Sequence, residues 1–216
     1  MSMSSPASPA VPDHAPVHPA AVRISHWINA LAVLVMVMSG WKIYNASPIF
    51  PFLFPRDITF GGWLGGALLW HFAAMWLLVA NALFYLVYNL ATGRLRCTFF
   101  PLRPAELLHD LRDALRLRLA HTDLSRYNAV QKASYLSVML ALVLVFLSGL
   151  AIWKPVQFSL LRELMGDFDN ARIMHFATMA WIVGFAAVHL LMVLLVPKTF
   201  GSMTLRLRRR AVKDNA

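Results

Sequence analysis

Residues 173–196 of the chain read IMHFATMAWIVGFAAVHLLMVLLV, with no Asp, Glu, Lys or Arg among them. An α-helix rises about 1.5 Å per residue, so about 20 apolar residues are enough to cross the hydrocarbon layer of a bilayer. The stretch therefore predicts a transmembrane helix. His175 and His189 lie 14 residues apart in it. This separation is close to four helical turns, which places both imidazoles on one face of the helix, roughly 21 Å apart.

Three other apolar stretches predict further spans at residues 24–44, 63–90 and 133–153. The last two contain none of the four charged residue types, and the first contains Lys42 alone, near its end. The whole chain has the same character, because 59% of its 216 residues are hydrophobic and only 14% are charged. So few charges cannot cover a soluble domain of this size. We expect an all-α membrane protein in which four transmembrane helices form a bundle over residues 22–198.

Lysine and arginine are distributed unevenly between the connections, and positive charge is retained on the cytoplasmic side of a membrane. Fifteen of them lie before span one, between spans two and three, or after span four, and five lie on the other side. Both termini are therefore expected in the cytoplasm. The net charge of +10 is also compatible with nucleic acid. However, no polar segment is large enough for a nucleic-acid-binding module, so no such partner is expected.

The segments outside the spans are polar or of low complexity. Residues 1–21 are rich in Pro, Ala and Ser and predict a disordered tail, and residues 199–216 form a basic cytoplasmic tail. Residues 104–120 place leucines at helical spacing between charged side chains, which predicts a short cytoplasmic helix in the membrane interface between spans two and three. The histidines in these segments are interpreted as ordinary solvated side chains: His14, His18, His109 and His121.

Four histidines lie within or at the edges of the spans: His26, His71, His175 and His189. An ionisable side chain in a membrane is costly and usually functional, although any single neutral imidazole can equally hold helices together. With both termini inside, His71 and His175 fall in the periplasmic half of the membrane. His26 and His189 then fall in the cytoplasmic half. Two imidazole pairs at two depths of a helix bundle are what two b-type haems require as axial ligands.

Other metal centres fit this pattern less well. Zinc or copper needs three or four ligands at one point, whereas these histidines divide two and two. Cys97 is the single cysteine, which excludes a disulfide framework and a protein-ligated iron–sulfur cluster. Arg23 precedes His26 by about one helical turn. Its guanidinium is a candidate partner for a haem propionate, and charge retention on the cytoplasmic side explains it about equally well.

Two sequence motifs resemble those of a known family. RISHWIN at residues 23–29 is similar to the R-x-x-H-W-x-N opening of the bacterial cytochrome b561-like membrane subunits. YNAVQK at residues 127–132, followed by Ser148-Gly149-Leu150, is similar to the Y-N-x-x-Q-K motif that opens their third helix. The family includes the b-type cytochrome of nickel–iron hydrogenase, the gamma subunit of formate dehydrogenase and thiosulfate-reductase-like cytochrome b subunits. The resemblance covers about residues 22–198.

The resemblance implies a two-haem cytochrome b, with His26 and His189 on the inner haem and His71 and His175 on the outer haem. It also implies a quinone pocket that includes Asn128 and Gln131. This chain has Val130 where related members have glycine, which changes the shape of that pocket. Without the resemblance, Asn128 and Gln131 are simply polar side chains at a helix entry.

The leading hypothesis is an electron-transfer subunit without catalytic residues of its own. It would pass electrons between the membrane quinone pool and a periplasmic oxidoreductase, and the resemblance points to molybdopterin-dependent enzymes. The alternative is a stand-alone superoxide:ubiquinone oxidoreductase, which would need a cationic site near the outer haem, with Lys42, Lys154 or Arg172 as candidates. A haem-free transporter is a third class, disfavoured because the spans carry almost no other polar groups.

Overall fold

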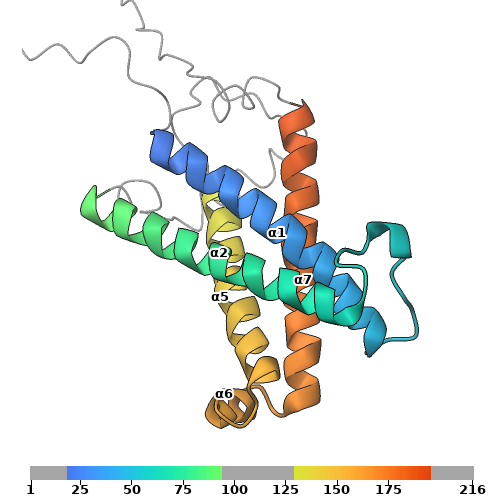
Figure 1. Cartoon of the computed structure of the whole chain (residues 1–216). Coiled ribbons are helices and arrows are strands. Elements are labelled where there is room, and N and C mark those ends of the chain that lie inside the picture. Colours follow the sequence, from blue (N-terminus) through green and yellow to red (C-terminus); the bar gives the residue numbers. More distant parts are fainter. Residues whose placement is uncertain (1–18, 94–128, 196–216) are drawn as a thin grey trace, which may run out of the picture.

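The computed structural model describes residues 19–93 and 129–195, with the side chains of residues 129–132 excepted. Most of the described residues lie in four long helices (Figure 1). These are α1 (Ala20–Ala46), α2 (Leu64–Ala91), α5 (Ala129–Trp153) and α7 (Phe168–Leu195). Two short helices lie in the connections, namely the 3-10 helix η1 (Arg56–Ile58) and α6 (Ser159–Leu164). The predicted interfacial helix at 104–120 and most of both predicted tails lie outside the described residues.

Each long helix is long and apolar enough to cross a membrane. This confirms the predicted all-α membrane protein with four spans, while the orientation of its termini stays a prediction. The fourth helix begins at Phe168, five residues before the apolar stretch that predicted it. Asp167 explains the difference, because its carboxylate accepts a hydrogen bond of 2.6 Å from the backbone N–H of Asn170. An Asp in this position caps a helix start and extends the helix beyond its apolar part.

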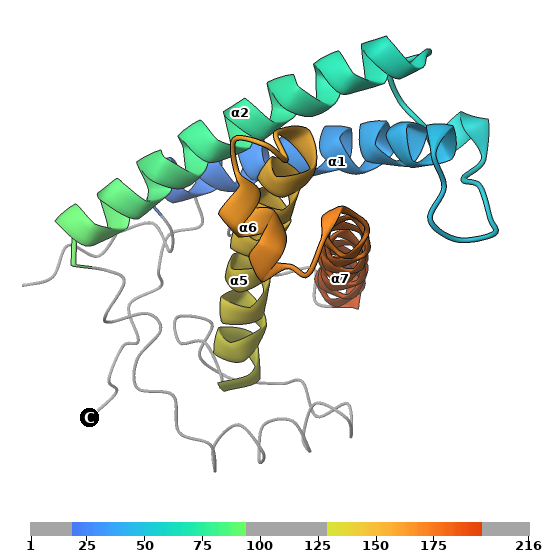
Figure 2. The ribbon, with the colours of Figure 1, turned by 90° about the horizontal axis from the view of Figure 1, so that it is seen from below.

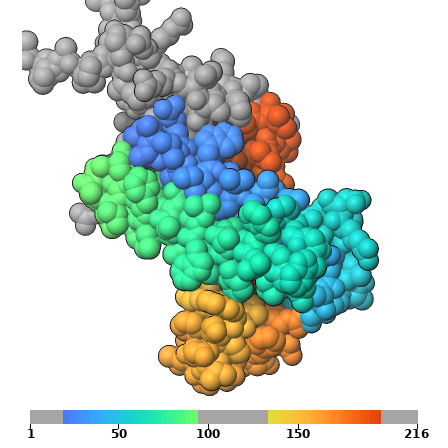
Figure 3. Space-filling view, in the orientation of Figure 1, coloured from blue at the N-terminus to red at the C-terminus, as the bar shows by residue number. Residues whose placement is uncertain are grey.

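The helices pack as two hairpins. α1 runs along α2, and α5 runs along α7. The two hairpins cross each other, so that α7 is seen along its axis in Figure 2 while α1 and α2 run across the view. In the space-filling view α2 lies across the face of the molecule and α6 forms its lower end (Figure 3). The crossing brings side chains of all four long helices together near the middle of the structure.

Small side chains form the helix interfaces. Among the described residues, the largest side chains that are completely buried are those of Ser25, Ser39 and Ser148. Alanine is the most frequent residue at the other buried positions, for example Ala67 and Ala151. Lipid provides no hydrophobic driving force between helices, so close approach through small residues supplies the packing. Large apolar side chains point outward instead, as expected for a surface that faces lipid.

The connection between α1 and α2 folds back onto the end of α1. Asn45 pairs through its amide with the backbone of Phe54, by hydrogen bonds of 2.8 and 2.9 Å. Tyr44 exchanges hydrogen bonds of 3.2 Å with the backbone of Phe50. Gly61 has a φ of 103°, and a Cβ there would lie 2.5 Å from the Cα of Ala67. The connection therefore needs glycine at its tightest turn, where it enters α2.

Asn81 supplies a polar contact between α1 and α2. Its amide nitrogen donates to the Ser25 carbonyl at 2.8 Å and to Asn29 Oδ1 at 2.6 Å. Replacing Asn81 with leucine, which has the same number of side-chain heavy atoms, is expected to lower the free energy of unfolding by about 1 kcal/mol. A denaturant titration of the purified protein in detergent measures this. Asn89→Leu is the matched control, because among the described residues the Asn89 amide bonds only the Tyr85 carbonyl of its own helix. An equal loss in both variants would contradict the interhelical role.

Candidate functional site

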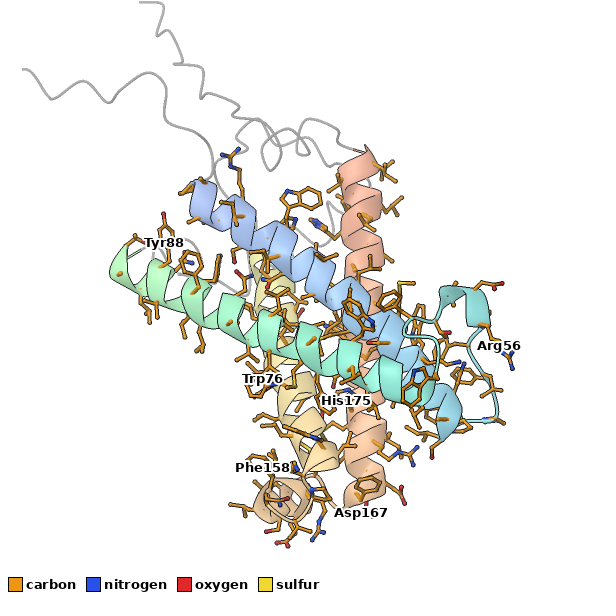
Figure 4. All side chains as sticks on the ribbon, in the orientation of Figure 1. Arg56, Trp76, Tyr88, Phe158, Asp167 and His175 are labelled. Carbon is orange, nitrogen blue, oxygen red and sulfur yellow. The ribbon has the colours of Figure 1, made fainter. Side chains whose placement is uncertain are left out.

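The four histidines of the spans meet in two pairs. The ring centres of His71 on α2 and His175 on α7 lie 6.4 Å apart, with their planes at 60°. Those of His26 on α1 and His189 on α7 lie 6.0 Å apart, at 67°. One helix, α7, thus contributes a ring to each pair. His175 lies where the α1–α2 hairpin crosses α7 (Figure 4).

The spacing within each pair fits two imidazoles on one metal ion. A bond between a metal and an imidazole nitrogen is about 2 Å long, and that nitrogen lies about 1 Å from the ring centre. Two rings on opposite sides of one ion therefore have centres about 6 Å apart. Both observed separations agree with this value. Two imidazoles on opposite sides of iron are a known axial ligand set of haem.

Hydrogen bonds identify which nitrogen of His71 carries the proton. Its Nδ1 lies 3.1 Å from the carbonyl oxygen of Met36 and 3.1 Å from Oγ of Ser39. A carbonyl oxygen only accepts hydrogen bonds, so Nδ1 is the protonated nitrogen and Nε2 keeps its lone pair. A ligating histidine usually donates its other ring N–H to such an acceptor, which orients the ring and fixes the tautomer.

The same arrangement recurs at His175. Its Nδ1 lies 3.0 Å from the carbonyl oxygen of Val145 and 3.1 Å from Oγ of Ser148. A glycine follows the serine in each case. A Cβ at Gly40 would lie 3.4 Å from Cε1 of His71, and one at Gly149 would lie 3.3 Å from Cε1 of His175. Glycine thus allows each imidazole to lie directly against the backbone of the neighbouring helix.

A partly open pocket includes His71 and His175 in its wall. The remaining lining residues are apolar and come from all four long helices: Val33, Met36, Val37, Leu78, Leu142, Val145, Met179 and Ile182. Such a wall can surround a large, mostly apolar ring system, with the two histidines as the polar groups that hold it. Within residues 19–93 and 133–195, no three His, Cys, Asp or Glu side chains gather as a metal site requires. The donor set therefore fits haem and not zinc.

The pair of His26 and His189 has aromatic neighbours. Phe185 stacks on His189 at 6.0 Å with an angle of 6°, and Trp27 meets His26 edge-on at 5.6 Å. The Nε atom of Arg23 is buried and has no hydrogen-bond partner in the described part of the chain. Buried polar groups are normally paired, so this atom fits an anionic partner such as a haem propionate.

The predicted quinone residues are not placed by the structure. Asn128 lies outside the described residues. Gln131 lies in the first turn of α5, and its side chain is not described. The sequence reasoning also missed Ser39, although the repeated Ser-Gly pair at 39–40 and 148–149 was a signal for it.

Two of the three cations proposed for a superoxide site have structural contacts. The guanidinium of Arg172 donates to the carbonyl and hydroxyl oxygens of Ser47 and lies 3.5 Å from the Asp169 carboxylate. The ammonium of Lys154 lies 5.2 Å from the ring centre of Trp153. Lys42 is half-buried on α1. Since Arg172 and Lys154 already have partners, the structure does not favour a cationic substrate site built from them.

The site thus consists of histidines that face each other across membrane helices. Where Nδ1 is protonated, as in His71 and His175, Nε2 is free to bind a metal. This is the ligand arrangement of a b-type cytochrome. The comparison with protein families agrees: the prokaryotic cytochrome b561 family matches residues 17–206. The chain belongs to this family, which confirms the resemblance seen in the sequence. It is therefore a b-type cytochrome, a multi-pass electron-transfer subunit of a bacterial membrane.

The chain is also similar to one individual curated protein within the comparison. Over 187 residues the chain is 53% identical to a protein of Azospira oryzae described as "Putative protein-methionine-sulfoxide reductase subunit YedZ1". The match covers 87% of this chain and 94% of that protein. The two proteins are thus similar over nearly their whole lengths.

Proposed function

We propose that the chain is a dihaem cytochrome b that carries electrons from the membrane quinone pool to a periplasmic protein-methionine-sulfoxide reductase. The observation that carries this proposal is the pairing of four histidines at two depths, with ring centres 6.4 and 6.0 Å apart. The name of the curated relative suggests the class of partner. The connections between the described helices are too short to contain a catalytic domain, which supports a separate partner protein.

The proposal assigns residues to each part of the relay. His71 and His175 would hold the outer haem, His26 and His189 would hold the inner haem, and Arg23 would pair with a propionate. Haem supplies a carrier that accepts and releases one electron at a time. Along α7 the two ligands are separated by roughly 21 Å, so the relay covers most of the hydrocarbon layer. The apolar residues that line the pocket around the outer pair disfavour water beside it.

The direction of transfer follows from the partner's chemistry. A reductase consumes electrons, so quinol is the donor and the respiratory quinone pool is the source. We place the quinone beside the inner haem, near Asn128 and Gln131, with both termini in the cytoplasm. The outer haem then faces the periplasmic partner.

A purified complex tests this function. The chain would be tagged, extracted in mild detergent with its bound partner, and examined by reduced-minus-oxidised spectroscopy. We expect about two b-type haems per chain, the number that four axial histidines can hold. Added quinol should reduce them, and protein-bound methionine sulfoxide should reoxidise them only when the partner is present.

Three results would contradict the proposal. A ratio of one haem per chain would break one histidine pair, and haems that quinol does not reduce would remove the donor. If the chain without any partner reduces ubiquinone with superoxide, the alternative oxidase function is correct. The superoxide assay therefore accompanies the quinol assay on the same preparation.

A further inference from the structure

The outer histidine pair lies against two buried serines, Ser39 and Ser148, and no serine is hydrogen-bonded to the inner pair in the described part of the chain. We propose that Ser39 and Ser148 are positioning residues that fix the rotation of His71 and His175 and so hold the two ligand planes of the outer haem at a steep angle. This proposal rests on the proposed haem ligation by these histidines. The two ring planes are 60° apart.

Each serine acts as an acceptor toward its histidine. Ser39 is completely buried, and its hydroxyl donates to the Val35 carbonyl at 2.6 Å. Ser148 is equally buried, and its hydroxyl donates to the Leu144 carbonyl at 2.8 Å. A hydroxyl has one proton and two lone pairs, so the lone pairs remain for the histidine. The Nδ1–H group 3.1 Å away can therefore donate to the serine oxygen.

Each Nδ1–H group is held between two acceptors on one helical turn. For His71 they are Oγ of Ser39 and the Met36 carbonyl, both on α1. A single carbonyl would let the ring rotate about the bond that joins it to Cβ, whereas a second acceptor beside the first narrows the range of that rotation. The acceptors belong to the neighbouring helix, so the ring angle is set by helix packing and not by the histidine's own backbone.

The arrangement occurs twice with nearly the same dimensions. In both hairpins the carbonyl, the serine three residues later and the following glycine surround one imidazole. The carbonyl distances are 3.1 and 3.0 Å, and both serine distances are 3.1 Å. The Cβ positions built on the two glycines lie 3.4 and 3.3 Å from the rings. Two different sequence contexts have produced one geometry, which indicates a shared requirement and not an accident of packing.

The inner pair provides an internal comparison. In residues 19–93 and 133–195, neither ring of His26 and His189 is hydrogen-bonded by a serine or a backbone carbonyl. Phe185 stacks on His189 instead. A change that affects the serines should therefore alter one haem and leave the other unchanged.

Electron paramagnetic resonance of the oxidised holoprotein tests the proposal. Steeply crossed axial imidazole planes give low-spin ferric haem a highly anisotropic signal, whereas parallel planes give a rhombic one. Ser39→Ala and Ser148→Ala keep the carbonyl acceptor, so we expect about two haems per chain to remain. The low-field feature of the outer haem should broaden, because its ligand samples a wider range of angles.

The redox potential gives a second readout. Fewer acceptors on Nδ1–H make the imidazole a weaker donor to iron, so the midpoint potential of the outer haem should rise. The inner haem should keep its potential and its signal. Ser39→Cys and Ser148→Cys, which keep a weak acceptor in a similar volume, should shift both readouts less than the alanine variants. The two cysteine variants also allow the proposal to be tested if an alanine variant loses haem.

Ser137→Ala is the matched control. Ser137 lies on α5, as Ser148 does, and its hydroxyl donates to the Ser134 carbonyl of its own helix at 2.8 Å. This variant should resemble the unmodified protein in both readouts. If the Ser39 and Ser148 variants also match the unmodified protein, the proposed positioning role is wrong. Fewer than two haems in the unmodified protein would instead contradict the proposed dihaem function itself.

Discussion

Replacing His175 with alanine is expected to lower the haem content of the purified protein from about two per chain to about one, and to abolish quinol-driven reduction of the partner. His175 and His71 face each other with ring centres 6.4 Å apart, so the loss of one ring leaves the other without an opposing ligand. Alanine favours the helical conformation, and α7 should still form. The pyridine haemochrome assay with protein quantification measures the ratio.

His189→Ala should remove the other haem and leave that of His71 and His175. The two variants should therefore show complementary absorption spectra that sum to the spectrum of the unmodified protein. His109→Ala is the control, because this histidine is predicted to be an ordinary solvated side chain. Two haems in the His175 variant, or one haem in the His109 variant, would contradict the proposed ligands.

Gly149→Val is expected to have an effect almost as large. A Cβ alone would lie 3.3 Å from Cε1 of His175, which is already tighter than ordinary contact. Valine adds two methyl groups, and its branched side chain has little rotational freedom in a helix. The imidazole must then move away from α5 and lose its hydrogen bonds to Ser148 and the Val145 carbonyl. We expect loss of the outer haem with the inner haem retained.

Gly184→Val is the matched control for this substitution. Gly184 is exposed, and a Cβ there meets nothing within 4 Å. It follows His175 by nine residues, which places it on the opposite face of α7. Both variants introduce the same β-branched residue into a membrane helix, so they share any cost in helix propensity. If Gly149→Val keeps both haems, the close approach of His175 to the α5 backbone is not required for binding.

Much of this architecture can be predicted from the amino-acid sequence. Apolar stretches of about 20 residues or more with at most one charged residue predicted each span, because burying a charge in lipid is costly. The 14-residue separation of His175 and His189 placed both rings on one face of α7, because helical periodicity is a local property. The motif around His26 led to the correct family. Hydropathy, periodicity and motif all depend on residues close together in sequence.

Contacts between helices depended on the tertiary structure. Ser39 reaches His71 over 32 residues of sequence, and Ser148 reaches His175 over 27. No local sequence pattern predicts which serine faces which imidazole ring, because that depends on how the helices of each hairpin pack. The tautomers, the ring angles and the need for glycine at 40 and 149 all follow from that packing. The sequence by itself thus determined which stretches form the membrane helices and which histidines share a face of α7. Only the tertiary structure decided how those histidines are held, because hydrogen-bond direction is set by atoms of neighbouring helices.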